Sequence, residues 1–297
     1  MKLGLWQRNL ASAGVLALAA GLASGCTYAS QQLDSAPGFD VTPIREVPEV
    51  AALVPEHIKA DGALTIVADA TYPPMEFVAA DGQTAIGLDI DIAKAVARIM
   101  GLEPKISTAS FDSIIPAIGP KYEIGFSAFT ITPARIDAVN MISYFEAGSQ
   151  LAVRAGNPTG LDPNSYCGAT IAVQIGTTQQ EQLEADNRGK CQTNPVNILP
   201  YESQADATAN LVGGKADAMY ADSPITEYAV TQTGGAIETF GPLHDSAPYG
   251  VVVAKDDPEF AVAVQAALQE LMDSGALNKI ARAWGNESGA QTVSHLN

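Results

Sequence analysis

The chain has 297 residues, 47% of them hydrophobic, which is enough for one large domain or two ordinary ones. Its formal net charge is −17, so no nucleic-acid partner is expected and the surface is poorly suited to anionic membranes. The three histidines lie far apart, and neither a C-x-x-C nor an H-E-x-x-H motif is present, so no metal and no cofactor is expected.

The first 25 residues have the features of a secretory signal peptide. Lys2 and Arg8 precede the apolar run LASAGVLALAAGLA, whose length suits that role. The run ends in LASGC, which resembles a bacterial lipobox, in which Cys26 is lipidated and becomes the mature N-terminus; Ala23 stands where leucine is usual. The alternative is ordinary secretion with a chance cysteine. No second apolar run is long enough to span a bilayer.

The segment after Cys26 differs in composition from the rest of the chain. Residues 27–48 are polar, contain prolines and show no period, which predicts a tether. Residues 48–62 add a short helix that ends at Gly62. From Ala63 onward the pattern is that of a folded domain.

Strands and helices alternate from Ala63, and the pattern restarts at Cys167. Buried strands that alternate with helices predict an α/β fold, and the restart indicates two lobes. Strands are predicted at 63–69, 103–109, 122–130, 149–156, 167–176, 196–202, 216–222 and 251–255. Helices are predicted at 86–101, 111–119, from 131, and at 177–186, 203–214, 223–235, 258–275 and 276–285, with a loop at 70–85.

Two further cysteines, Cys167 and Cys191, form an even pair in an exported chain. An oxidising compartment favours a disulfide between them, and two buried free thiols are the alternative. They bracket a strand, a turn and a helix. A disulfide that closes a loop of this size contributes about 3 kcal/mol to the free energy of unfolding.

Three junctions between a strand and a helix share one pattern. They are GFSAFT-ITPAR, IAVQIGTT-QQ and AMYAD-SPITEY, each with an apolar strand, a small polar residue and a helix start. In α/β sheets ligands lie beyond the carboxyl ends of strands, and helix starts attract anions. At the first junction Thr132 is the predicted cap and Pro133 the first helical residue, which places Arg135 in the first turn.

Charged groups at these junctions suit a zwitterion. The fork of donors on Arg135 matches a carboxylate, Thr130 and the backbone at Thr178 add donors, and Asp222 suits an ammonium. A free α-amino acid carries both groups. Alternatives are a plain surface role for Arg135 and helix capping by Asp222.

Seven stretches resemble one known family, the family 3 extracellular solute-binding proteins, which are the amino-acid-binding lipoproteins of ABC importers. The stretches are DATYPPMEF, GLDIDIAKAVA, FDSIIPAI, KYEIGFSAFTITPAR, VQIGTTQ, GKADAMYADSP and SAPYGVVVAK, and the resemblance runs from about Ala63 to Gly285. It implies a two-lobed, periplasmic-binding-protein-like α/β fold of type II, with two hinge strands that cross near 151–157 and 244–250. Lobe 1 would comprise 63–153 and 247–285, lobe 2 would comprise 154–246, and 286–297 would be a C-terminal tail.

The family pattern assigns a role to each matched position. It implies that Arg135 binds the ligand α-carboxylate, helped by Thr130 and the backbone at Thr178. It also implies that Asp222 binds the α-ammonium together with the carbonyl of Ala128.

The remaining matched positions concern the ligand side chain. The resemblance implies that Tyr72 and Phe111 sandwich it and that Asp69, Asp89 and Gln174 touch its distal end. Other interpretations stay open, because Asp89 can cap a helix, the two aromatics can be core residues, and Gln174 can face away from the cleft.

The implied ligand is a free polar or cationic L-amino acid, of the glutamine, arginine, lysine or histidine class. No second basic residue stands at a matched position, and a buried, unpaired carboxylate is costly, so an acidic ligand is disfavoured. The expected protein is a monomer, extracytoplasmic and lipid-anchored to the outer face of the cell membrane, which delivers its ligand to an ABC transporter permease.

No enzymatic activity is expected. Some proteins of this fold are dehydratases of cyclic acids, but these need a general acid at the reacting carbon, and no histidine falls at a matched cleft position. His244, near the predicted cleft edge, is interpreted as a surface residue. The other alternative is a lipid-anchored sensor or co-receptor that feeds no transporter.

Overall fold

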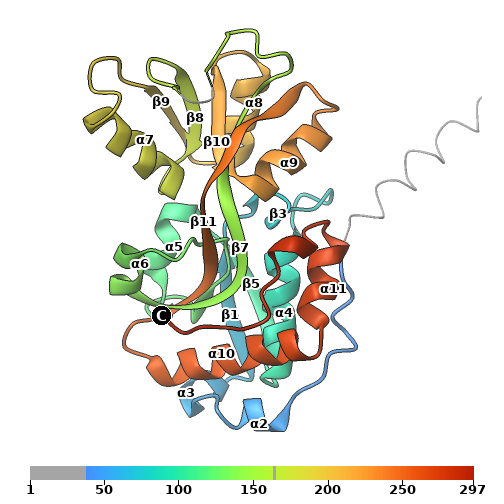
Figure 1. Ribbon diagram of the computed structural model, residues 1–297. Coiled ribbons are helices and arrows are strands. Elements are labelled where there is room, and N and C mark those ends of the chain that lie inside the picture. Colours follow the sequence, from blue (N-terminus) through green and yellow to red (C-terminus); the bar gives the residue numbers. More distant parts are fainter. Residues whose placement is uncertain (1–37, 163–164) are drawn as a thin grey trace, which may run out of the picture. The chain divides into compact units, whose positions relative to one another are not determined.

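The computed structural model describes residues 38–297 except 163 and 164 (Figure 1). Cys26, the predicted signal peptide and the first half of the predicted tether (27–37) lie outside these residues. One eight-stranded sheet, in the order β5-β1-β6-β11-β7-β10-β8-β9, runs through this part of the chain. Its strands are β1 (Ala63–Ala68), β5 (Glu103–Thr108), β6 (Ile124–Gly125), β7 (Val139–Arg154), β8 (Thr170–Gln174), β9 (Asn197–Tyr201), β10 (Ala218–Asp222) and β11 (Ile237–Ala254).

Two long antiparallel strands, β7 and β11, join the two lobes (Figure 1). In lobe 1, β5, β1 and β6 are parallel, and β6 pairs with the end of β11. In lobe 2, β10, β8 and β9 are parallel, and β10 pairs with β7. The two-lobed α/β fold predicted from the sequence is therefore observed.

The two crossings between lobes follow from this pairing. In β11, whose crossing is expected at 244–250, the register with β7 shifts between His244 and Ala247. In β7 the crossing lies between Ala147 and Ser149, because residues 149–153 already pair with β10 of lobe 2. The expected crossing at 151–157 thus overlaps the part of β7 that pairs with β10.

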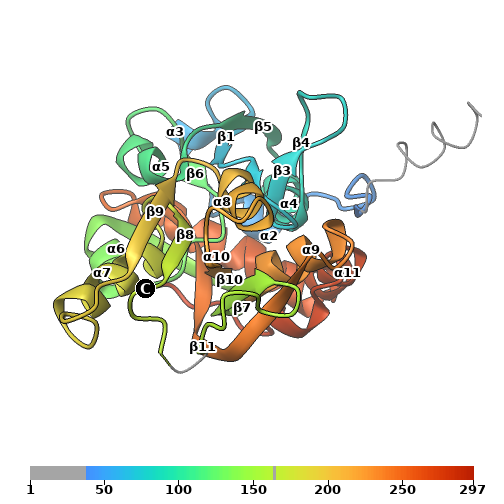
Figure 2. The same ribbon diagram turned by 90° about the horizontal axis from the view of Figure 1, so that it is seen from above.

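Helices cover the faces of the sheet in both lobes (Figures 1 and 2). Lobe 1 carries α4 (Leu88–Ile99), α5 (Phe111–Ala117), α6 (Pro133–Ala138), α10 (Pro258–Asp273) and α11 (Ala276–Ala283). Lobe 2 carries α7 (Thr178–Arg188), α8 (Gln204–Val212) and α9 (Ser223–Gln232). The predicted loop at 70–85 contains most of a small sheet of β2 (Thr71–Tyr72), β3 (Glu76–Val78) and β4 (Ala85–Ile86).

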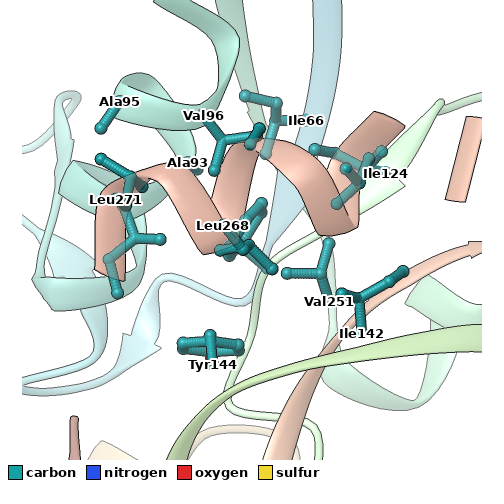
Figure 3. Packing of buried hydrophobic residues seen from close by; sticks show 14 of the residues in the cluster. Ile66, Ala93, Ala95, Val96, Ile124, Ile142, Tyr144, Val251, Leu268 and Leu271 are labelled. Carbon is teal, nitrogen blue, oxygen red and sulfur yellow. The ribbon is translucent and has the colours of Figure 1, made fainter. Parts of the chain in front are cut away.

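The core of lobe 1 lies between helix α10 and the strands (Figure 3). Leu268 and Leu271 of α10, Val96 of α4, and Ile66 and Ile124 of the strands belong to one buried cluster. Burying a side chain of this kind stabilises the fold by about 1.5–3 kcal/mol. This packing gives the strand ends of lobe 1 a rigid base.

The described end of the predicted tether is packed against lobe 1. Val41 is buried, and the N–H of Phe39 donates to Asp91 Oδ2 at 2.9 Å. The following turns are α2 (Pro48–Ala51) and α3 (Glu56–Lys59), with Val50 and Ile58 buried. The prediction of a tether is therefore wrong for residues 38–48, because their few apolar side chains pack against the lobe 1 core.

The predicted C-terminal tail is also part of the fold. After a short 3-10 helix, η1 (Glu287–Gly289), the chain runs along the free edge of β7. The N–H of Ser143 donates to His295 O at 2.9 Å, and that of Asn297 to Met141 O at 2.8 Å. The segment covers an edge strand that would otherwise expose its backbone, and polar composition gave no sign of this.

The predicted disulfide is confirmed. Cys167 and Cys191 are joined, with their Cα atoms 5.1 Å apart, and the loop they close contains β8 and α7. Across 38–297, outside the gap at 163–164, none of the helices has the length and hydropathy that crossing a bilayer requires.

Candidate functional site

A pocket lies between the two lobes, at the junctions singled out in the sequence. Its lining includes eight of the ten predicted ligand residues and adds Thr177 and Gln179. The eight are Tyr72, Phe111, Ala128, Thr130, Arg135, Gln174, Thr178 and Asp222. The structure therefore brings together residues that are up to 150 positions apart in the chain.

The side chains nearly fill this pocket. The remaining cavity has a volume of about 10 Å³, which is room for roughly one water. Contacts between lobes account for this: Tyr72 donates to Asp222 Oδ2 at 2.8 Å, and Gln174 Nε2 donates to Asp69 Oδ2 at 2.6 Å. A ligand as large as an amino acid needs these contacts to separate first.

Arg135 occupies the place predicted for it. Thr132 caps α6, accepting a bond from the Arg135 N–H at 3.3 Å, and Pro133 stands in the first turn. The guanidinium donates to the carbonyls of Thr130 at 2.9 Å and Gly176 at 3.1 Å. It also lies over the ring of Phe111, 5.5 Å from its centre.

The charge of Arg135 has no direct counter-charge. It takes part in none of the ion pairs found across the described ranges. Burial lowers the pKa of Arg135, but a guanidinium remains a cation at neutral pH. A half-buried cation that bonds only to carbonyls is suited to receive an anion.

Asp222 supplies the opposite charge at the end of β10. It stands at the N-cap position of α9, yet its side chain makes no capping bond. Its Oδ1 accepts from Gln179 Nε2 at 2.8 Å and its Oδ2 from Tyr72. Burial raises the pKa of Asp222. The capping alternative is thus excluded in this structure, since the carboxylate turns into the pocket.

Two predicted residues lie outside the pocket lining. Asp69, at the end of β1, is 2% exposed and supports the wall by accepting from the Phe111 N–H at 3.1 Å and from Gln174. Asp89 is 0% exposed and accepts from the Ala128 N–H and the Tyr144 hydroxyl, each at 2.7 Å. Asp89 therefore lies behind the wall, because the first turn of α4 directs it into lobe 1, and it neither lines the pocket nor caps the helix.

Ala128 has an unusual backbone conformation. Its φ of +47° is in the left-handed region, which costs a residue with a Cβ roughly 1–3 kcal/mol. The hydrogen bond from the Ala128 N–H to Asp89 holds this conformation. Two residues further along, Thr130 forms an antiparallel β-bridge with Tyr249. The pocket wall is thus built from a strained segment tied down on both sides.

Gln179 is a pocket residue that sequence reasoning missed. It is 2% exposed and bonds both Asp222 and Ser149, at 2.8 and 2.7 Å. The run TTQQEQ offers several similar glutamines, and only the position in the first turn of α7 after the Thr177 cap distinguishes this one.

One cavity thus combines a cation, an anion, an aromatic pair and helix N–H groups. This set can hold a molecule that carries both a carboxylate and an ammonium. Groups of three or more metal-ligating side chains do not occur in the part of the chain that the structure describes. Two lobes joined by two strands, with such a pocket between them, define a binding protein of the periplasmic type.

Comparison with known proteins identifies the family. The chain matches the bacterial extracellular solute-binding proteins, family 3, over residues 64–287, and belongs to that family. It is 34% identical over 283 residues to a Corynebacterium glutamicum protein named arginine-binding protein ArgT, covering 94% of this chain and 92% of that protein.

Solved structures agree with this assignment. A mutant of ArgBP from T. maritima is 30% identical, with a TM-score of 0.70 over 77% of this chain and 98% of that one. An ancestral arginine-binding protein bound to glutamine is 29% identical, with a TM-score of 0.69 over 76% and 99% of the two chains. ArgT and the ancestral protein are both named for arginine binding.

Proposed function

We propose that this protein binds one free L-amino acid between its lobes and delivers it to the permease of an ABC importer. The observation that carries the proposal is that Arg135 and Asp222 line the same pocket. The two side chains carry opposite charges but are not bonded to each other. Two relatives support it, since ArgT and the ancestral protein are named for arginine binding.

Each end of the ligand has a partner. The carboxylate bonds the Arg135 guanidinium, the Thr130 hydroxyl and the N–H of Thr178 at the start of α7. The ammonium bonds Asp222 and the carbonyl of Ala128. Each charge-assisted bond contributes about 1.5–3 kcal/mol, and micromolar affinity requires about 8 kcal/mol, so this set supplies much of it.

The ligand side chain lies between Tyr72 and Phe111 and reaches toward Gln174. Arginine is the ligand we favour, because Asp69 stands directly behind Gln174 and gives this end of the pocket a negative charge. Glutamine is the second choice, since Gln174 offers both a donor and an acceptor to an amide. Glutamate is disfavoured, because the pocket lining holds no second cation to pair with its side-chain carboxylate.

The protein acts outside the cytoplasm. Residues 1–25 are removed as a signal peptide, Cys26 is lipidated, and the anchored chain works as a monomer on the outer face of the cell membrane. Labelling with radioactive palmitate tests the anchor. The wild type should incorporate the label, and Cys26→Ser should not. Incorporation into both would show that another residue is modified.

A thermal-shift screen of all common amino acids tests the function. Arginine or a similar polar amino acid should raise the melting temperature, and a screen without any hit would reject the proposal. Chromatography of the recovered ligand separates binding from turnover, because a dehydratase would return a changed molecule. A permease that fails to take up ligand from the loaded protein would favour the sensor alternative.

A further inference from the structure

Two carboxyl groups are buried side by side behind the pocket wall. Glu76 on β3 and Asp89 in the first turn of α4 are both 0% exposed. Gly87 brings them together: its φ is 140°, and a Cβ there would stand 2.1 Å from the carbonyl of Met75. The start of α4 therefore rests directly on β3, with the Asp89 N–H bonded to Met75 O at 2.9 Å.

Only one oxygen of each carboxyl group is occupied by its neighbours. The hydroxyl of Ser127 donates to Glu76 Oε1 at 2.7 Å. Asp89 Oδ2 accepts from Ala128 and Tyr144. Glu76 Oε2 and Asp89 Oδ1 are buried and have no hydrogen-bond partner in the described ranges, and the two carboxyl groups are close enough for the charge of Asp89 to act on Glu76.

Two ionised carboxylates in contact inside a protein repel each other strongly. Burial, and then the charge of Asp89, raises the pKa of Glu76 well above its usual range. Burial raises the pKa of Asp89 to about 6, against the hydrogen bonds it accepts. The other titratable groups that face the pair are Asp69, Tyr72 and Tyr144, and none of them brings a positive charge.

We propose that Glu76 and Asp89 share one proton at neutral pH, and that this pair positions the binding-site segment at Ser127 and Ala128. Glu76 donates from Oε2 to Asp89 Oδ1, which gives a partner to the two oxygens that lack one. Its Oε1 is then the carbonyl oxygen that accepts from Ser127. The positioning role rests on the proposed function, whereas the shared proton does not.

The pair reaches the pocket by two routes. Asp89 holds the N–H of Ala128, whose φ of +47° requires such support. Through Ser127 the pair reaches Asp69, whose N–H donates to the Ser127 hydroxyl at 3.0 Å and whose carboxylate accepts from Gln174. Both ends of the proposed ligand therefore depend on one buried proton.

Infrared difference spectroscopy tests the shared proton directly. The chain from residue 26 onward, with Cys26→Ser, is compared with its Glu76→Gln variant at neutral pH. The wild type should show the C=O stretching band of a protonated carboxylic acid, and the variant should lack it. Identical spectra in the carboxylic-acid region would overturn the proposal, whether or not the protein binds an amino acid.

Arginine affinity tests the positioning role. Glu76→Leu should weaken binding about tenfold or more, whereas Glu76→Gln, which keeps one donor and one acceptor, should restore it to within about threefold. Asp91→Asn is the matched control. Asp91 is a buried carboxylate on α4, the helix that carries Asp89, and its side chain bonds Phe39 and Trp284 away from the pocket.

Each outcome of the affinity test is decisive. If Glu76→Leu folds and binds arginine with wild-type affinity, the positioning role is overturned. It is also overturned if Glu76→Gln loses more arginine affinity than Asp91→Asn does. If Glu76→Leu does not fold, the comparison of Glu76→Gln with Asp91→Asn decides alone. If the wild type binds no amino acid, the proposed function fails, while the infrared result still decides the shared proton.

Discussion

The hydroxyl of Tyr72 lies 2.8 Å from Oδ2 of Asp222 and joins β2 of lobe 1 to the end of β10 of lobe 2. The same hydroxyl accepts from the backbone N–H of Asp222 at 3.3 Å. Both residues are buried, so neither bond is shared with solvent. The carboxylate proposed to bind a ligand ammonium is thus held by a side chain of the opposite lobe.

Replacing Tyr72 with phenylalanine should weaken the contact between the lobes. The ring remains to pack on a ligand, but Asp222 loses a buried hydrogen bond, whose net value is about 1.5–3 kcal/mol because one partner is charged. Small-angle scattering without added ligand should show a larger radius of gyration than the wild type. Tyr228→Phe on α9, whose ring packs on Phe77, is the control, and equal radii for all three proteins would contradict this role of Tyr72.

Removal of the disulfide should cost stability without affecting the site. Cys167→Ser with Cys191→Ser releases a loop of 24 positions, which is expected to lower the free energy of unfolding by about 3 kcal/mol. For a domain of this size the melting temperature should fall by roughly 6–12 °C. Calorimetric melting curves measure this change, and a loss of arginine binding in the folded variant would show that the loop also shapes the pocket.

Acidification to mild pH should stabilise the protein. Burial raises the pKa of Asp69, Asp89 and Asp222, that of Asp89 to about 6. A raised pKa means that the folded state binds protons more tightly, so this contribution is fully present below the unfolded pKa and is lost as the pH rises through the folded value.

The melting temperature should therefore be higher at about pH 5 than at about pH 7.5, because the folded state takes up protons in this window. Asp89→Asn should flatten the dependence, since it removes one of the titrating groups. A melting temperature that falls steadily from neutral pH to about pH 5 would show that other groups dominate.

The local sequence predicted most helices but not the long strands. Thr132 and Pro133 define the start of α6 without reference to the rest of the chain, and the structure agrees. The first part of β11 contains Gly241, Pro242 and Pro248, which disfavour a strand locally. Pairing with β7 overrides this, and the register shifts in β11 accommodate the irregular residues.

The charged core of the site was predictable because strand ends meet at one edge of a sheet. This rule brought Arg135, Thr178 and Asp222 together from three separate junctions. It says nothing about which way a side chain turns inside a helix. Asp89 and Gln179 both stand in first turns, and only tertiary packing sends one behind the wall and the other into the pocket.

Arg135→Ala should weaken arginine binding by about 100-fold or more, which corresponds to about 2.7 kcal/mol. The melting temperature should change little, because the guanidinium donates only to backbone carbonyls. Water can donate to these carbonyls instead when the two lobes separate. Arg135→Lys should recover part of the affinity, since lysine restores the charge but not the fork. Arg188→Ala at the exposed end of α7 is the control, and similar affinities for the two alanine variants would return Arg135 to a surface role.

Isothermal titration of the wild type with arginine tests the central claim most directly, with glutamine, lysine, histidine and glutamate titrated in parallel. We expect arginine to bind at one site per chain with a micromolar or tighter dissociation constant, and glutamate not to bind. Binding of none of these amino acids to the folded protein would contradict the account.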